Sequence, residues 1–236
     1  MPQEFLRVVF SPGVAPDKWF TRFDERVAGW SVAAAQAENP LLYLDATTAD
    51  LAIVRLSVEA EEARGGVAIN DKYHHVRLYD EQVGIAAPKD HPIAVEKQVR
   101  AAELGEEKIM YATPTDGEVV VGDVREALQV VAANVGVAVA PRPLLRGINQ
   151  RGVVHRDLVG LGELEQKLGR PVGGTRVALM WLKERDDEVI QDFVGICKGR
   201  GEGSSRQVTR KAGVKRRGAG SGGRKPRRTR RDKRLG

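Results

Sequence analysis

Cysteine is almost missing from this chain, because Cys197 is the only one among 236 residues. A single thiol excludes an intrachain disulfide and any metal site built on several cysteines, and it suits a reducing compartment. No apolar run approaches the length of about 18 residues that a membrane-spanning helix needs. The first residues also lack the basic segment of a secretory signal peptide. We therefore expect a cytoplasmic protein that does not enter a membrane.

Motifs of catalysis are missing as well. The sequence contains no nucleophile elbow, no phosphate-binding loop and no dinucleotide fingerprint. Of the four histidines, His74 and His75 are neighbours on an expected strand, where adjacent side chains face opposite ways. His91 and His155 belong to other segments, so no metal site is expected. We predict a protein that is not an enzyme and that carries neither a cofactor nor a metal.

Acidic residues are scarce in residues 198–236. This segment holds 16 of the 38 Lys and Arg residues but only two acids, so its net charge is +14. The rest of the chain has 22 basic and 30 acidic residues and a net charge of −8, so the overall +6 describes neither part. Because the segment also has too few large apolar residues to form a core, we expect residues 199–236 to be a disordered tail.

The natural partner of such a tail is a polyanion. If about eight of its charges meet phosphates, log K should fall with log salt at a slope of about −7, without sequence preference. The tail has no aromatic residue, so stacking on single-stranded bases is not expected. Ribosomal RNA, an acidic protein surface or no dedicated partner at all are the alternatives. The predicted contacts are Lys215, Arg216, Arg217, Arg224, Lys225, Arg227, Arg228, Arg230, Arg231, Lys233 and Arg234.

The body of the chain alternates between short apolar runs, typical of buried strands, and amphipathic segments. Strands are expected at 5–10, 30–37, 51–56, 76–87, 108–112, 137–140, 153–158 and 175–182. Helices are expected at 16–28, at about 40–47, through Leu104, from Asp123 (in capping-box spacing with Glu126) to 135, after Pro141 and after residue 184. Residues 59–71 and 163–174 are expected to be loops. The predicted class is α/β, and the length suits two small lobes.

This order of segments resembles the substrate-binding (effector) domain of LysR-type bacterial transcription regulators. The resemblance covers nearly all of residues 5–198, and its most distinctive element is Pro88-Lys89-Asp90-His91-Pro92 after a strand. Further matching segments are Phe5–Trp19, Asp50–Val54 and Gly136–Pro141. The resemblance implies a two-lobed, periplasmic-binding-protein-like (type II) fold with two chain crossovers, near 84–88 and near 158–174. Lobe I would comprise residues 1–86 and 170–198, and lobe II residues 87–169.

The sequence departs from the family pattern in two places. The chain starts directly at the first strand of the effector domain, without the winged helix-turn-helix and linker helix of these regulators. We therefore expect a stand-alone effector domain without ordinary operator recognition. At Asn134-Val135-Gly136 a glycine that is frequent in the family is replaced, which leaves the local loop geometry open.

Candidate ligand-binding residues follow from topology, because α/β sheets bind ligands at the carboxyl ends of their strands. The predicted set is Ser11, Pro12, Gly13, Val14, Asn39, Arg55, Leu56, Thr113 and Pro141, with Glu38 beside it. Free N–H groups after Pro16 and Pro141 suit a small anion. Ordinary turn or capping roles remain the alternative for Ser11 and Thr113, and a surface ion pair is the alternative for Arg55.

These observations predict a regulator-like protein that senses a small, anionic metabolite and binds nucleic acid through its tail. The resemblance implies a homodimer in which the helix at 16–28 lies beside the partner's helix at 123–135. One alternative is an accessory subunit that pairs with full-length LysR-type regulators without binding DNA. Others are a cytoplasmic solute-binding protein and a nucleic-acid-associated scaffold with an unused cleft.

Overall fold

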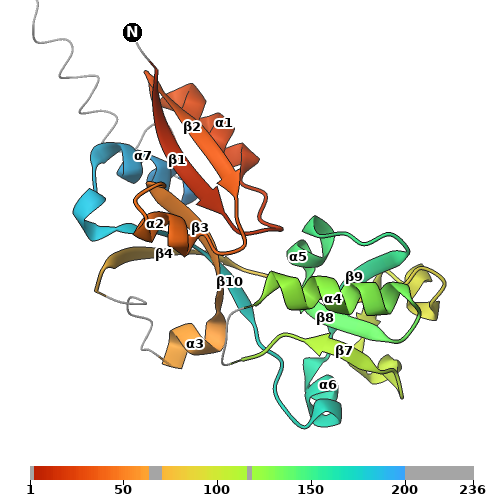
Figure 1. Cartoon of the computed structure of the whole chain (residues 1–236). Coiled ribbons are helices and arrows are strands. Elements are labelled where there is room, and N and C mark those ends of the chain that lie inside the picture. Colours follow the sequence, from red (N-terminus) through yellow and green to blue (C-terminus); the bar gives the residue numbers. More distant parts are fainter. Residues whose placement is uncertain (1–2, 64–70, 116–118, 200–236) are drawn as a thin grey trace, which may run out of the picture. The chain divides into compact units, whose positions relative to one another are not determined.

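Two five-stranded sheets organise the chain, as the computed structural model in Figure 1 shows. The structure describes residues 3–63, 71–115 and 119–199. The tail, with its expected disorder and its cationic side chains, lies outside the described residues. Each sheet has helices packed on both faces, which confirms the predicted two-lobed α/β fold. Among the described helices, none combines the length and the apolar character needed to cross a membrane.

Lobe I is built on the first sheet, with strand order β2-β1-β3-β10-β4. Strand β1 is parallel to β2 and β3, whereas β10 is antiparallel to β3 and β4. The strands are β1 Glu4–Phe10, β2 Trp30–Gln36, β3 Leu51–Ser57, β4 Tyr73–Asp80 and β10 Thr175–Leu182. The helices are α1 Asp17–Arg26, α2 Leu41–Asp45, α3 Val58–Ala63, the 3-10 turn η3 Lys183–Arg185 and α7 Glu188–Cys197.

Both faces of this sheet are buried, which explains the continuous apolar run of β3. Leu51 and Ile53 belong to the cluster that packs on α1 and α7, and the alternate residues of the strand pack toward α2. Phe23 of α1 meets Phe193 of α7 edge to face, with ring centroids 5.6 Å apart. Cys197 packs beside them, and burial raises the pKa of its thiol to about 12. The thiol therefore stays protonated and unreactive.

Lobe II is built on the second sheet, with strand order β6-β9-β5-β8-β7. Strand β5 lies at its centre and is antiparallel to both β8 and β9. The strands are β5 Val83–Pro88, β6 Gln98–Arg100, β7 Ile109–Ala112, β8 Val137–Pro141 and β9 Val153–Val159. The helices are α4 Val121–Ala132, α5 Arg142–Gly147, α6 Leu161–Leu168 and two 3-10 turns, η1 Pro92–Val95 and η2 Ala101–Leu104.

The chain crosses between the lobes at two pairs of adjacent residues. The N–H of Glu81 donates to Thr175 O in lobe I (2.8 Å), while Gln82 O accepts from the N–H of Arg142 in lobe II (2.8 Å). At the second crossover, Gly173 donates to Thr113 O (2.9 Å) and Gly174 O accepts from Val58 N–H (3.0 Å). Each crossover therefore lies between two consecutive residues.

The first crossover lies before the expected 84–88, and the lobe boundary expected at residue 86 is therefore wrong. Residues 76–87 form two strands rather than one, because β4 ends at Asp80 and β5 joins the other sheet from Val83. The sequence pattern is typical of a strand along the whole segment, so it does not show where the chain passes from one sheet to the other. The second crossover lies inside the expected range 158–174, although it follows the boundary expected at residue 170.

Four further local expectations are wrong at least in part. Residues 59–71 and 163–174 were expected to be loops, but α3 extends to Ala63 and α6 to Leu168, and residues 64–70 lie outside the described residues. The short helix expected through Leu104 is the 3-10 turn η2, with β6 and a second 3-10 turn, η1, before it. Asp123 does not cap α4, because the N-cap is Val120, and Asp123 lies in the first turn. Its carboxylate there still faces the positive end of the helix dipole.

A buried charged cluster fastens α3 to the first sheet. Glu61 accepts hydrogen bonds from Arg77 Nε (2.7 Å) and from an Arg176 guanidinium nitrogen (2.8 Å). His75 Nε2 lies 3.3 Å from Glu61 Oε1 and, among the described residues, makes no hydrogen bond. Burial lowers the pKa of His75; Glu61 opposes the shift, and the two arginines add to it. The imidazole is therefore held neutral.

We expect stability to fall as the pH decreases from about 7 to 5. Burial also lowers the pKa of His155 in lobe II, with Arg142, Arg146 and Arg156 acting in the same direction. Because the unfolded chain takes up these protons at about pH 6.5, the neutral imidazoles stabilise the fold fully above that pH and progressively less below it. The free energy of urea unfolding, measured as a function of pH, should show this decline.

Substituting the histidines singly and together separates their contributions. His75→Leu should flatten the decline in part, and His75→Leu combined with His155→Leu should flatten it further. If the single variant and the parent chain gave parallel pH curves, His75 would not be the group responsible.

Candidate functional site

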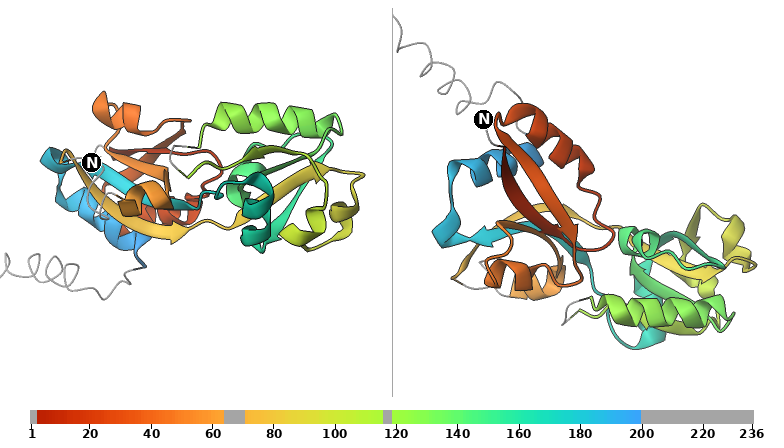
Figure 2. Two further views of the ribbon diagram at one scale, coloured as in Figure 1. Left: turned by 90° about the horizontal axis from the view of Figure 1, so that it is seen from below. Right: turned by 45° about the horizontal axis from the view of Figure 1, so that its top comes forward.

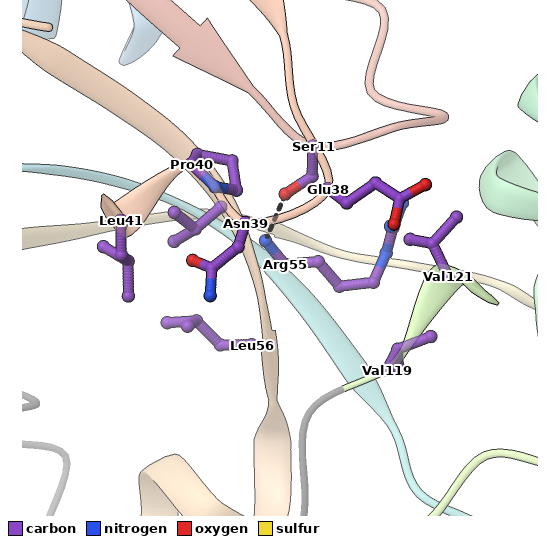
Figure 3. A pocket seen from close by; sticks show the side chains of 10 residues that line it. Ser11, Glu38, Asn39, Pro40, Leu41, Arg55, Leu56, Val119 and Val121 are labelled. Atoms are coloured by element: carbon purple, nitrogen blue, oxygen red, sulfur yellow. Dashed lines mark hydrogen bonds between the residues drawn. The ribbon is translucent and has the colours of Figure 1, made fainter. Parts of the chain in front are cut away.

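A small pocket lies where β1, β2 and β3 end, facing the first residues of α4 (Figure 3). Four of the predicted ligand-binding residues line it: Ser11, Asn39, Arg55 and Leu56. The remaining lining residues are Glu38, Pro40, Leu41 and Val54 of lobe I and Val119 and Val121 of lobe II. The carboxyl ends of three strands thus supply its polar groups, as the topology predicts.

Arg55 is held by a buried carboxylate at the first crossover. Its Nε lies 2.5 Å from Glu81 Oε2 and its terminal NH2 nitrogen 2.9 Å from Oε1, in a bidentate pair. Thr175 donates its hydroxyl to the same carboxylate (2.9 Å). The Arg55 side chain is 4% exposed and that of Glu81 0%, so this is not the surface ion pair considered for Arg55. The other terminal nitrogen, NH1, has no acceptor among the described residues.

Ser11 makes a hydrogen bond at the strand end and also lines the pocket. Its Oγ accepts a hydrogen bond from the N–H of Arg55 (3.2 Å) and so closes the end of β1 onto β3 (Figure 3). The same residue lines the pocket. Thr113, in contrast, is 1% exposed and is no lining residue of the pocket; its backbone joins the second crossover.

The loop after β1 contacts lobe II instead of lining the pocket. At Gly13, which has a φ of 83°, a Cβ atom would come within 2.5 Å of Pro143 O on α5. At Gly147, a Cβ atom would come within 2.7 Å of the Gly13 Cα. Two glycines therefore allow the two backbones to meet. Pro12, Gly13 and Val14, predicted to bind ligand, do not line this pocket; Gly13 makes the contact with α5, and Val14 packs in the lobe I core.

Pro141 is a further predicted ligand-binding residue that lies outside the pocket. It ends β8, pairs with Val83 and is buried. Helices α1 and α5 begin near Pro16 and Pro141, but neither helix supplies a lining residue. The anion site expected at these two helix starts is therefore not part of this pocket.

Two polar contacts join the lobes beside the pocket. Arg125 of α4 forms an ion pair with Glu38, and Ser57 donates its hydroxyl to Thr115 O (2.8 Å). The pocket beside these contacts has a volume of about 30 Å³, and side chains of both lobes line it.

Glu81 and the valines of lobe II were not among the predicted residues. Glu81 lies inside what the sequence presents as one strand, so no pattern marks it as the partner of Arg55. Val119 and Val121 come from a separate lobe, and their place depends on how the lobes pack.

Solved structures with this arrangement of sheets and crossovers include the BenM effector-binding domain with its effector benzoate. That structure matches with a TM-score of 0.56 and 13% identity over 90% of this chain and 95% of that chain. The full-length regulator CbnR complexed with its target DNA has a TM-score of 0.56 and 13% identity, over 84% of this chain and 71% of that one. The fold is that of a LysR-type effector-binding domain.

The reduced OxyR regulatory domain from Pseudomonas aeruginosa shares this fold, with a TM-score of 0.53 and 14% identity over 85% of this chain and 98% of that chain. No protein-family model and no curated protein matches the sequence. The expectation of a LysR-type effector-domain fold with two crossovers is confirmed.

The glycine contact between the lobes can be tested with two alanine variants. Gly147→Ala should destabilise the chain by about 1–3 kcal/mol, because the new methyl group must push the Gly13 backbone away. Gly162→Ala is the matched control, since a methyl group added at this position of α6 would meet no atom within 4 Å. The control should stabilise the chain by about 0.4–1 kcal/mol. Urea unfolding of both variants gives the comparison, and equal effects would contradict the contact.

Proposed function

We propose that this chain is a ligand-sensing module of a transcription regulator that closes on a small-molecule effector between its two lobes. The observation that carries the proposal is the pocket at the strand ends, whose polar side chains all come from lobe I and whose lining residues from lobe II are both valines. In two-lobed α/β folds, such a position is where ligands bind. The related solved structures are regulatory domains, which fits a non-enzymatic role.

The pocket favours an effector that accepts hydrogen bonds, and a small anion is the best candidate. Arg55 uses Nε and one terminal nitrogen on Glu81, so its NH1 is left to donate to a ligand. Glu81 neutralises most of the positive charge, so the effector would be oriented by hydrogen bonds more than attracted over distance. The side chain of Asn39, which is exposed, supplies a further polar group.

Effector entry would shift a population between closed and open arrangements. The closed arrangement keeps the Glu38–Arg125 ion pair and a pocket of about 30 Å³. A ligand stabilises whichever arrangement it contacts better, and it can shift the equilibrium only by that difference in affinity. Separation of Val119 and Val121 from the lobe I side chains is the change that admits a metabolite.

An effector identified by thermal-shift screening of small carboxylates should bind more weakly when a lobe I side chain of the pocket is altered. Asn39→Ala should weaken binding by about tenfold, the equivalent of one hydrogen bond, without a change in the stability of the free chain. The matched control is Asn149→Ala, an exposed asparagine of lobe II outside the pocket. Calorimetry of both variants measures the affinities. Equal losses in the two variants, or none, would place the effector elsewhere.

A homodimer is the proposed assembly, formed through α1 of one protomer and α4 of its partner. Strand β2, the edge of the first sheet, supports this proposal because Ala33, Ala34 and Ala35 are exposed on it. In the views of Figure 2, α1 lies alongside this edge strand. Natural sheets cover or charge such an edge, so an apolar one beside an amphipathic helix suits a protein partner.

The proposed role of the tail is sequence-independent binding of nucleic acid in the cytoplasm. This proposal comes from composition, because residues 198–236 carry +14 while the preceding residues carry −8. A dimer would bring two tails to one particle, and a second tethered contact raises the avidity for a polymer that both can reach.

Salt dependence measures the contribution of the tail. The full chain should bind random double-stranded DNA with a slope of log K against log salt of about −7. A chain that ends at Lys198 should lose this binding. Fluorescence anisotropy over a salt series gives both slopes. Absence of binding by the full chain at low salt would contradict the role of the tail and leave the effector proposal untouched.

A further inference from the structure

Lobe I contains a second hollow, at the opposite end of its parallel strands from the effector pocket. We call it the lobe I pocket; it is lined by Phe5, Leu6, Arg7, Trp30, Asp50, Arg185, Asp187, Val189 and Ile190. These residues come from the starts of β1 and β2, from the residue before β3 and from the segment that leads into α7. Its walls belong to a single lobe, so it does not depend on how the lobes close.

The size of the lobe I pocket suits a small ring. Its volume is about 190 Å³, against about 30 Å³ for the effector pocket. An apolar cavity of about 150 Å³ is large enough to bind benzene. A ring with one polar substituent therefore fits here without any movement of the lobes.

The charged groups of the pocket leave one guanidinium available. Asp50 accepts from Arg7 Nε (3.0 Å), from a terminal nitrogen of Arg7 (2.6 Å) and from a terminal nitrogen of Arg185 (3.0 Å). Arg7 also donates to Thr47 O (3.1 Å), so it is well occupied. Arg185 makes only the bond to Asp50 among the described residues, and its side chain is 40% exposed.

The second carboxylate of the pocket, that of Asp187, caps a helix. Asp187 is the N-cap of α7 and accepts from the N–H of Ile190 (2.8 Å), where it also faces the positive end of the helix. Its negative charge therefore interacts with the N-terminus of α7. Two guanidinium groups share the remaining carboxylate, Asp50, which leaves the free donors of Arg185 for a further acceptor.

Apolar side chains complete the pocket. Phe5 is 56% exposed, an unusual amount for an aromatic residue on the first strand of a sheet. Trp30 and Val189 also line the pocket and are partly buried; Trp30 pairs with Glu4 and therefore projects from the sheet face opposite to that of Phe5. A ligand ring would cover this apolar surface while its charged end meets the guanidinium.

We propose that the lobe I pocket binds a small carboxylate with a ring-sized apolar body, whose carboxylate pairs with Arg185 and whose ring packs on Phe5. This site is separate from the effector pocket and independent of the function proposed for that pocket. Occupation would link the β1–β2 edge to the start of α7, so the ligand should stabilise lobe I.

Trp30 provides a direct probe of the site in the full chain. The indole N–H signal of Trp30 in a ¹H–¹⁵N spectrum, assigned from a Trp30→Phe variant, should shift on titration with millimolar phenylacetate. The indole signals of Trp19 and Trp181 are internal controls, since neither residue lines the pocket. Phenylacetamide has the same size and no charge, so it should shift the Trp30 signal at least tenfold more weakly.

A pair of arginine variants tests the assigned partner. Arg185→Gln should weaken phenylacetate binding about tenfold, whereas Arg22→Gln, an exposed arginine of α1 outside the pocket, should leave it unchanged. An unmoved Trp30 signal would overturn the site. Equal binding of the amide, or equal binding by the Arg185→Gln variant, would overturn the assignment of a carboxylate on Arg185.

Discussion

The buried pair of Arg55 and Glu81 is the interaction that fixes the part of lobe I from which the chain crosses to lobe II. Two charges removed from water must be closely matched, and breaking such a pair costs about 3–5 kcal/mol in proteins. Here the carboxylate stands at the first crossover, and the guanidinium stands at the carboxyl end of β3. Because Thr175 also donates to this carboxylate, the pair joins β3, β10 and the point where the chain leaves lobe I.

The fold class could be predicted from the sequence because burial on both faces leaves a clear signal. Continuous apolar runs identified β3 and β10, which lie next to each other at the centre of their sheet. The rule that ligands bind at the carboxyl ends of strands then identified Ser11, Asn39 and Arg55, because each stands at a strand end. These predictions depend on local pattern and topology alone.

The remaining predictions failed where the outcome depends on packing between distant segments. The close approach of the Gly13 backbone to α5 was not predicted, because α5 lies more than a hundred residues away in the sequence. After Glu81 the chain passes from the first sheet to the second. Glu81 is hydrogen-bonded to lobe I and Gln82 to lobe II, and neither residue type predicts such a change. Helix α6 was missed because glycines at both ends outweighed the Leu161, Leu164 and Leu168 spacing that buries one face.

The placement of each crossover between two consecutive residues has a mechanical consequence. Neighbouring peptide groups belong to different lobes at Glu81–Gln82 and again at Gly173–Gly174, and Glu81 is hydrogen-bonded to Thr175. A rotation of one lobe on the other therefore needs to change only a few backbone dihedral angles and can leave the strand pairing of both sheets intact. Such a rotation would pivot at these two crossovers, one of which holds Glu81, the partner of Arg55. It would thus change the distance between Arg55 and the two valines, Val119 and Val121, that line the same pocket from the other lobe.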